Sequence, residues 1–246
     1  MESGPRNIQY RIIDNLPGNS NFCPLVRRTS FLEKMIAKDF RQKIHETLNR
    51  YDPNLLQRAA AFLYLKETQS PFEVEREKPS PQRAQRFADL LRQAEINRPL
   101  TERNLVELQN AVVDTRFQET HWRTRQNWLG RDLGYCRWVD FVPPRPEDVP
   151  QLMNGLLALA EHAEKWEQKI SGKGEMDPVV LTACIAFGFV FIHPFMDGNG
   201  RIHRYLIHEI LQKTGFTPPG IVLPVSAVIL ANLKGYMEAL ETWRKP

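Results

Sequence analysis

Residues 193–204 carry the side chains in this sequence whose types and spacing are best suited to chemistry. They read HPFMDGNGRIHR, so a histidine is followed by an acid, a Gly-Asn-Gly turn and two arginines. His193 can take up a proton near neutral pH. Arg201 and Arg204 are three residues apart, and on a helix both could reach one anion. The stretch therefore combines a candidate base with a candidate anion site.

The Gly-Asn-Gly turn favours phosphate as that anion. Gly198, Asn199 and Gly200 lie at the expected start of a helix, where unpaired N–H groups and the helix dipole attract negative charge. Asp197 would repel a bare phosphate, but a carboxylate can hold Mg²⁺ against phosphate oxygens. These residues predict phosphoryl or nucleotidyl transfer with His193 as the base that activates a hydroxyl. The structural alternative is a plain turn beside a core histidine.

Two predicted helices position this loop. The apolar run 179–192 is too short to span a membrane, and we expect a buried helix there. Asp177 is its expected cap and Pro178 its first residue. An amphipathic helix is expected over 200–213. The loop therefore joins the end of a core helix to the start of a second helix.

Most of the remaining chain is also predicted to be helical, because apolar residues recur at helical spacing after capping residues. The expected helices are 31–48 after Thr29 and Ser30, 54–66, one from Ser80 and Pro81, one from Thr101, 149–170, and 226–244. Aromatic residues and glycines between 117 and 144 favour a loop and a hairpin. The first 28 residues are expected to form an irregular or β-containing arm.

The composition restricts the classes of function. The chain has 246 residues, 42% of them hydrophobic and 25% charged, which suits a large globular domain with or without an appendage. Its 33 basic and 29 acidic residues are scattered, so no nucleic-acid interface is indicated. Three distant cysteines predict neither a disulfide framework nor a zinc site. Because residues 1–9 are polar and no run spans a membrane, we expect a cytoplasmic protein without membrane contact.

The signature resembles that of one protein family. HPFMDGNGRIHR matches the Fic pattern H-x-F-x-[DE]-G-N-G-R-x-x-R at every fixed position. The segments NFCPLVRRTSFLEKMI, RTRQNWLG, FVPPRPEDVPQLM and SAVILANLKGYMEALE are also similar to bacterial Fic proteins with an N-terminal helical extension. The resemblance implies an all-α fold, a helical bundle with a small β-hairpin flap. Residues 1–100 would form the arm and extension, and residues 101–246 the catalytic domain.

The resemblance implies a protein adenylyltransferase that uses ATP and Mg²⁺. His193 would deprotonate a Ser, Thr or Tyr hydroxyl of a target protein, and Asp197 would hold Mg²⁺. Arg201 would contact the β-phosphate and Arg204 the γ-phosphate, while Phe195 would anchor the loop in the core. The nucleotide-binding residues would be Gly198, Asn199, Gly200, Arg201, Arg204 and Tyr236, the last lining the nucleoside pocket with a core role as the alternative.

A flap at residues 130–142 would, by the same resemblance, bind the target segment by strand addition. The candidate docking residues are Leu133, Tyr135, Trp138 and Phe141, for which packing in the core is the alternative.

A regulatory glutamate is also implied. Residues 70–77 read SPFEVERE, similar to the stretch S-S-F-x-I-E-G-E, which places Glu75 at the position of an inhibitory glutamate that would pair with Arg204. Pro71 and Arg76 depart from the inhibitory pattern, and both changes would weaken docking of the helix. A solvated charged segment is the alternative.

Other functions stay open on the sequence alone. A related transferase could move another phosphate-containing group. A silent Fic scaffold that binds a peptide is a different class, although the presence of His193 and Asp197 argues against it. Removal of AMP from a target would require Glu75 to position a water. A homodimer is left open, and a C-terminal module could follow Pro246.

Overall fold

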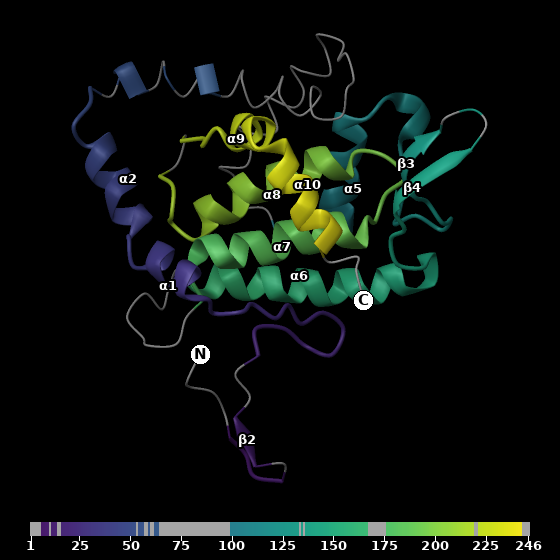
Figure 1. Ribbon diagram of the computed structural model, residues 1–246, viewed down its shortest axis with the longest axis horizontal. Helices are drawn as coiled ribbons and strands as arrows, with labels where there is room; N and C mark the ends of the chain where they lie inside the picture. Colours follow the sequence, from purple (N-terminus) through teal and green to yellow (C-terminus); the bar gives the residue numbers. More distant parts are fainter. Residues whose placement is uncertain are drawn as a thin grey trace.

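Figure 1 shows the computed structural model of the chain. The structure describes residues 6–9, 11–13, 16–52, 54–56, 59, 62–63, 99–132, 134, 136–166, 176–218 and 221–242. Over these residues helices dominate, and the strands form two short antiparallel pairs. The prediction of an all-α fold with a small hairpin is confirmed.

The elements follow each other along the chain as short helices, a hairpin and then longer helices. The helices are α1 (Ser30–Ile36), α2 (Phe40–Leu48), α5 (Glu102–Val112), α6 (Val149–Trp166), α7 (Pro178–Ile192), α8 (Asn199–Lys213), α9 (Val225–Ala231) and α10 (Leu233–Thr242). Two 3₁₀ turns are η1 (Thr115–Phe117) and η2 (Pro146–Asp148). Strand β1 (Arg6–Asn7) pairs with β2 (Ile12–Ile13), and β3 (Leu129–Asp132) pairs with β4 (Arg137–Phe141).

Helix α7 forms the centre of the bundle. It packs against α6 and α8, and α5 packs against α8 (Figure 1). Its residues are apolar on nearly every side, which is typical of a helix surrounded by other elements. Ile185 and Phe189 of α7 are fully buried, as are Met153 of α6 and Leu206 of α8. The expected buried core helix is therefore confirmed.

Local capping chemistry starts several helices where the sequence predicts. The hydroxyl of Thr29 accepts from Leu32 N at 3.2 Å, and the hydroxyl of Thr101 accepts from Asn104 N at 3.2 Å. The carboxylate of Asp177 accepts from the first N–H groups of α7, and Pro178 opens that helix. These caps satisfy backbone donors that have no partner within the helix.

Two predicted helices are wrong in extent, because each is divided. The segment 31–48 forms α1 and α2, separated at Asp39, which adopts a left-handed conformation (φ 43°) and caps α2 through Gln42 N at 3.1 Å. The segment 226–244 forms α9 and α10, separated at Asn232, whose ψ of 41° is not helical. Residues 54–56 and 62–63 are helical as predicted. The helix predicted from Ser80 lies outside the described residues.

The arm before α1 is attached to the core through one aromatic side chain. A Cβ built on Gly188 of α7 would lie 2.4 Å from Phe22 Cζ, and one built on Gly155 of α6 would lie 2.7 Å from Phe22 Cβ. Gly188 therefore leaves the space that the ring occupies, and Gly155 leaves the space for the main chain and Cβ of Phe22. Gln151 also donates to Asn21 at 2.9 Å. In Figure 1 the arm runs along α6, and its short β1–β2 pair confirms the predicted β-containing arm.

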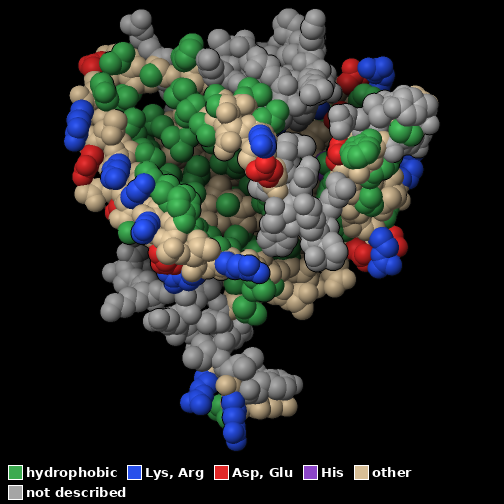
Figure 2. All heavy atoms as spheres, viewed as in Figure 1, with side chains coloured by type: hydrophobic (Ala, Val, Ile, Leu, Met, Phe, Trp, Pro, Cys, Tyr) green, Lys and Arg blue, Asp and Glu red, His purple; other side chains and the backbone are tan. Residues whose placement is uncertain are grey.

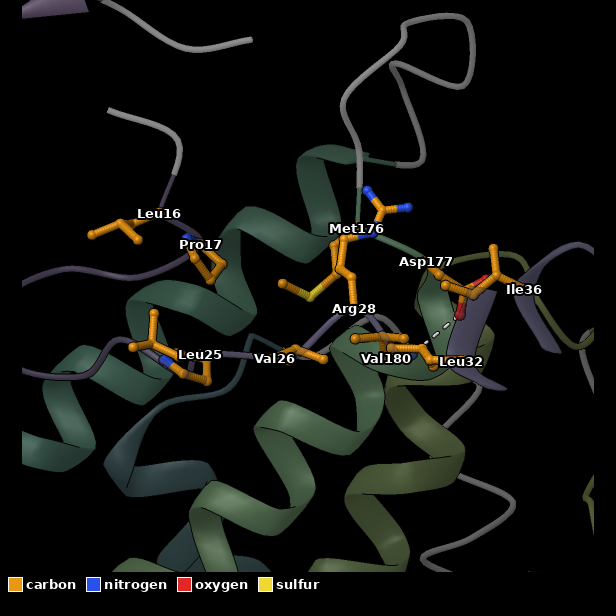
Figure 3. A pocket seen from close by; sticks show the side chains of 11 residues that line it. Leu16, Pro17, Leu25, Val26, Arg28, Leu32, Ile36, Met176, Asp177 and Val180 are labelled. Atoms are coloured by element: carbon orange, nitrogen blue, oxygen red, sulfur yellow. Dashed lines mark hydrogen bonds between the residues drawn. The ribbon is translucent and has the colours of Figure 1, made fainter. Parts of the chain in front are cut away.

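Apolar side chains also reach the surface. An apolar pocket of about 370 Å³ lies between the arm, α1 and the start of α7, with Leu25, Leu32 and Val180 among its lining residues (Figure 3). Figure 2 shows a hollow with hydrophobic side chains between α2 and α9.

Among the described residues, no helix combines the length and hydropathy that a membrane span requires.

Candidate active site

The candidate site lies where α7 ends and α8 begins. His193 is the C-cap of α7 and donates its N–H to Phe189 O at 2.9 Å. Its backbone is left-handed, with φ 54° and ψ 59°, a conformation that costs a residue with a Cβ about 1–2 kcal/mol. Such a conformation persists only where surrounding contacts hold it. The loop therefore turns sharply at His193, directly before the phosphate-binding motif predicted from the sequence.

The imidazole of His193 is buried and neutral. The side chain is 6% exposed, and burial, with a smaller effect from the charge of Arg123, lowers its pKa to about 4. Nδ1 lies 3.2 Å from the carbonyl of Val190. Because a carbonyl can only accept, the proton of the neutral ring belongs on Nδ1. Nε2 is then left with a lone pair that can accept a proton.

Phe195 packs in the core as expected. Its side chain is fully buried. The centroid of its ring lies 5.2 Å from that of Trp122 and 6.3 Å from that of Phe189 of α7. Asn199 ties the loop to α8, because its side chain accepts from Phe195 N at 3.1 Å and donates to Phe195 O at 2.7 Å. The loop is thus fixed by a ring in the core and by a closed pair of hydrogen bonds.

The start of α8 lacks a side-chain cap. Its N-cap, Gly198, has φ 88°, and a Cβ there would lie 2.8 Å from Val113 Cγ1. Gly200 follows in the first turn and is half-buried. A helix start built on glycine leaves its first N–H groups to an outside acceptor. This is the geometry that the Gly198-Asn199-Gly200 motif predicts for an anion site.

Two buried arginines lie behind this helix start. Arg201 donates to Asp197 Oδ1 at 3.0 Å and to Val112 O at 2.9 Å, and Arg204 is 2% exposed. The Asp197 side chain is 29% exposed and also accepts from Gly198 N at 2.6 Å. Among the described residues no group of three or more His, Cys, Asp or Glu side chains could hold a metal. One partly exposed carboxylate fits Mg²⁺ when phosphate and water supply the other ligands.

The segment 109–127 holds the main chain of the loop through hydrogen bonds. The sequence did not predict this contact. Every residue from 193 to 197 has a backbone atom bonded by this segment. The bonds are Arg123 Nε to His193 O (2.7 Å), Arg123 N to Pro194 O (2.8 Å), Asn127 Nδ2 to Phe195 O (3.1 Å), Met196 N to Glu119 (2.7 Å) and Gln109 Nε2 to Asp197 O (3.3 Å). The stretch RTRQNWLG, which resembles the family, contains two of these residues, Arg123 and Asn127. The resemblance alone does not predict that they hold the loop.

Tyr236 lies against His203 of α8. Its ring centroid is 6.3 Å from that of His203, the residue before Arg204. His203 is 4% exposed, and burial, with a contribution from the charge of Arg204, lowers its pKa to about 3. The structure thus places Tyr236 against His203, and its role in lining the nucleoside pocket stays a prediction.

The predicted hairpin is present next to this site. Leu129 pairs with Phe141 and Gly130 with Val139, with a bulge between Leu129 and Gly130. A Cβ on Gly130 would lie 2.0 Å from Trp138 O, so glycine is required there.

Of the four candidate docking residues of the hairpin, Trp138 and Phe141 are described, and their surroundings differ. Trp138 is 56% exposed and its indole donates to Asp140 at 2.8 Å. Phe141 packs on Phe191 of α7 with ring centroids 5.5 Å apart, which favours a packing role for that residue. Leu133 and Tyr135 lie outside the described residues, as does Glu75, so their roles stay predictions.

Comparison with known proteins identifies the family of this region. The sequence model of the Fic/DOC family matches residues 99–211. A protein adenylyltransferase Fic of Nematostella vectensis is 38% identical over 79 residues, which are 32% of this chain and 17% of the relative. A protein adenylyltransferase of Caenorhabditis briggsae is 35% identical over 103 residues, 42% of this chain and 17% of the relative. The matched part thus spans about a sixth of these relatives.

Solved structures show the same fold. A Fic family protein of Desulfovibrio desulfuricans G20 superposes with a TM-score of 0.66 at 21% identity, over 89% of this chain and 68% of that chain. A Fic domain containing signaling protein of Bacteroides thetaiotaomicron gives 0.60 at 21% identity, over 83% and 80%. The bundle and its N-terminal part therefore have solved counterparts.

Proposed function

Since residues 99–211 match the Fic/DOC family and the chain is thus a Fic domain protein, we propose that it transfers AMP from ATP to a hydroxyl of a target protein. One observation carries the proposal. A neutral buried histidine ends α7, and five residues later the uncapped start of α8 follows, with Arg201 and Arg204 buried behind it. A base and an anion site on one short loop are what nucleotidyl transfer to a hydroxyl needs.

In the proposed reaction His193 acts as the general base. A target hydroxyl oxygen attacks the α-phosphorus of ATP, and a new O–P bond forms. The bond from that phosphorus to the bridging oxygen breaks, and pyrophosphate leaves with the electron pair. The hydroxyl proton passes to Nε2 of His193, whose Nδ1 stays turned toward Val190 O. A bound triphosphate raises the basicity of the nearby imidazole, since negative charge favours its protonated form.

The rest of the motif would bind the nucleotide. The N–H groups at Asn199 and Gly200, and that of Gly198 once it leaves Asp197 Oδ1, would contact phosphate oxygens. Arg201 would contact the β-phosphate and Arg204 the γ-phosphate. Asp197 would hold Mg²⁺, which, when bound, offsets negative charge on the phosphates. Tyr236 would line the nucleoside site.

The hairpin β3–β4 would bind the target segment along one of its edges, with Trp138 as an exposed contact. We place the reaction in the cytoplasm, where ATP and Mg²⁺ are available. The free thiols of Cys23, Cys136 and Cys184 suit that compartment.

Intact-mass spectrometry after incubation with ATP and Mg²⁺ tests the proposal. We expect the wild type to gain the mass of one AMP on itself or on a supplied target, and His193→Ala to gain none. His121→Ala, a change of an exposed histidine, is the matched control and should behave as the wild type. A gain of one phosphate would instead identify a kinase, and no gain with any target would favour the scaffold function.

Regulation is tested in the same experiment. We propose that Glu75 represses transfer through Arg204, so Glu75→Gly should gain AMP faster than the wild type. Equal rates for the two proteins would exclude this regulation without affecting the proposed activity.

A further inference from the structure

The guanidinium of Arg123 is buried and donates hydrogen bonds to main-chain carbonyls. The residue is 3% exposed. Nε donates to His193 O at 2.7 Å, Nη1 to Arg125 O at 3.1 Å, and Nη2 to Pro144 O at 2.5 Å and to Ile192 O at 3.5 Å. Burying such a cation is costly unless its donors are satisfied. Here four carbonyls accept from the guanidinium.

These carbonyls belong to two different parts of the site. Ile192 and His193 form the C-terminal end of α7, where unpaired carbonyls and the helix dipole favour a cation. Arg125 and Pro144 lie just outside the two ends of the hairpin β3–β4. One planar side chain therefore joins the residue that carries the proposed base to both ends of the flap.

A second contact strengthens the link on the flap side. Gln126 donates to Pro143 O at 3.1 Å, so the two chain segments that lead into and out of the hairpin are tied together. On the other side, the N–H of Arg123 donates to Pro194 O at 2.8 Å, directly after His193. Arg123 thus connects the segments that flank the hairpin to the loop that carries His193.

We propose that Arg123 is a positioning residue that sets the place of the His193 imidazole relative to the hydroxyl that the flap presents. This inference rests on the proposed transferase function. Arg123 touches neither nucleotide nor target in this arrangement, and it acts by holding His193 in its left-handed conformation against the flap. Fixing the reacting groups within about 1 Å is worth roughly a hundredfold in rate.

Arginine is required for this role because of its shape. The guanidinium has five donors in a rigid plane, and here they reach carbonyls on opposite sides of the group. The ammonium of lysine is a single nitrogen, which could take the place of Nη2 between Pro144 O and Ile192 O but would leave His193 O and Arg125 O without the donors that Nε and Nη1 supply. Arg123→Lys therefore keeps the charge and breaks the bridge.

The first measurement is the rate of self-modification against ATP concentration, in whichever of wild type and Glu75→Gly transfers faster. We expect Arg123→Lys to lower kcat roughly a hundredfold, with KM for ATP within about twofold of the parent, since the nucleotide contacts are untouched. Arg125→Lys, a change in an exposed arginine two residues away, is the control and should keep the parent's kcat. An unchanged kcat in Arg123→Lys overturns the proposal.

The second measurement needs no transferase activity. Diethyl pyrocarbonate modifies neutral imidazoles that are accessible, and peptide mass spectrometry reports His193 separately. We expect the His193 modification rate to rise severalfold in Arg123→Lys and to stay at the parent's rate in Arg125→Lys. If the parent transfers no AMP, the proposed function fails, and this rate alone decides whether Arg123 holds the imidazole. An unchanged rate overturns the proposal.

Folding is checked by thermal melting of each variant. Should Arg123→Lys lose the parent's cooperative transition, Arg123→Gln is measured in its place, because its neutral amide donates to the α7 end alone. The same loss of kcat and rise in His193 reactivity support the proposal. If Arg123→Gln also fails to fold, Arg123 is a residue of core stability and the positioning role is rejected.

Discussion

Two histidines in this protein are kept neutral by burial. The pKa of His193 is lowered to about 4 and that of His203 to about 3, against an ordinary value near 6.5. In both cases desolvation is the main cause, and a nearby arginine adds to it. For His193 this state matches its proposed role, because only the neutral ring can accept a proton. For His203 it links folding to pH.

The first prediction concerns stability at acid pH. The unfolded chain takes up a proton at each histidine below about pH 6.5, whereas the folded chain resists protonation down to about 4 and about 3. The stabilisation is therefore complete above pH 6.5 and is lost as pH falls, by up to about 1.4 kcal/mol per pH unit for each histidine. Urea unfolding between pH 7.5 and 4.5 measures it.

His203→Gln is the variant that isolates one of these groups. It removes one of the two titrating side chains, so we expect a shallower fall of unfolding free energy with pH than in the wild type. A fall as steep as in the wild type would contradict the assignment to His203.

The second prediction belongs to the start of α8. Gly198→Ala places a Cβ at φ 88° and within 2.8 Å of Val113 Cγ1. We expect a loss of about 1–3 kcal/mol of unfolding free energy, since both backbone strain and a steric clash are added. Weaker ATP binding should follow, because the helix start moves. Calorimetric melting and titration with an ATP analogue measure the two effects.

Gly134→Ala provides the comparison for this variant. Gly134 has φ 79° at the tip of the hairpin, and nothing lies within 4 Å of a Cβ there. It therefore shares the strain of Gly198 but not the clash. If Gly134→Ala destabilises as much as Gly198→Ala and weakens ATP binding equally, the contact with Val113 is not what fixes the start of α8.

The starts of the helices could be predicted from the sequence, but the points at which two predicted helices are interrupted could not. Thr101 and Asp177 are capping residues that act on N–H groups two or three positions later, so the signal is local in the sequence. Asp39 and Asn232 interrupt apolar patterns that continue at helical spacing on both sides. Their backbone angles depend on how the flanking helices pack, which the spacing of apolar residues does not encode.

In the site, too, the features with a local sequence signal could be predicted and those set by distant contacts could not. The motif 193–204 brings its parts together through one loop, so its spacing alone indicated a base, an acid and an anion site. Gln109 and Glu119 hold that loop from 88 and 77 residues away, through main-chain atoms that any residue possesses. No spacing rule connects them to the motif. The part of that segment in RTRQNWLG resembles the family, but the contacts of the segment with the loop are known only from the three-dimensional structure.

Across the whole molecule, the N-terminal arm is attached by Phe22, and the third prediction tests this attachment. The ring of Phe22 lies against Gly188 of α7, the Cβ of this residue lies against Gly155 of α6, and the side chain packs on the hydrophobic core. We expect Phe22→Ala to lose about 2–4 kcal/mol of unfolding free energy, since a cavity is left between two glycines. Limited proteolysis should then cut the arm faster than in the wild type.

Leu25→Ala is the control for the arm. Leu25 is 68% exposed, so its truncation should change the unfolding free energy by less than about 0.5 kcal/mol. Equal losses in the two variants would show that the arm is attached along its length and that Phe22 has no special part.

The proposed base lies at the end of α7, a helix that packs against other helices of the bundle. Catalytic groups are often carried by surface loops that open independently of the body of a protein. Here His193 ends the helix that packs against both α6 and α8, so we expect it to belong to the segment that opens last. Local openings of the arm or the hairpin tip leave that helix closed. We therefore expect the turn at His193 to be lost only with global unfolding, whereas target binding at the hairpin can be lost earlier.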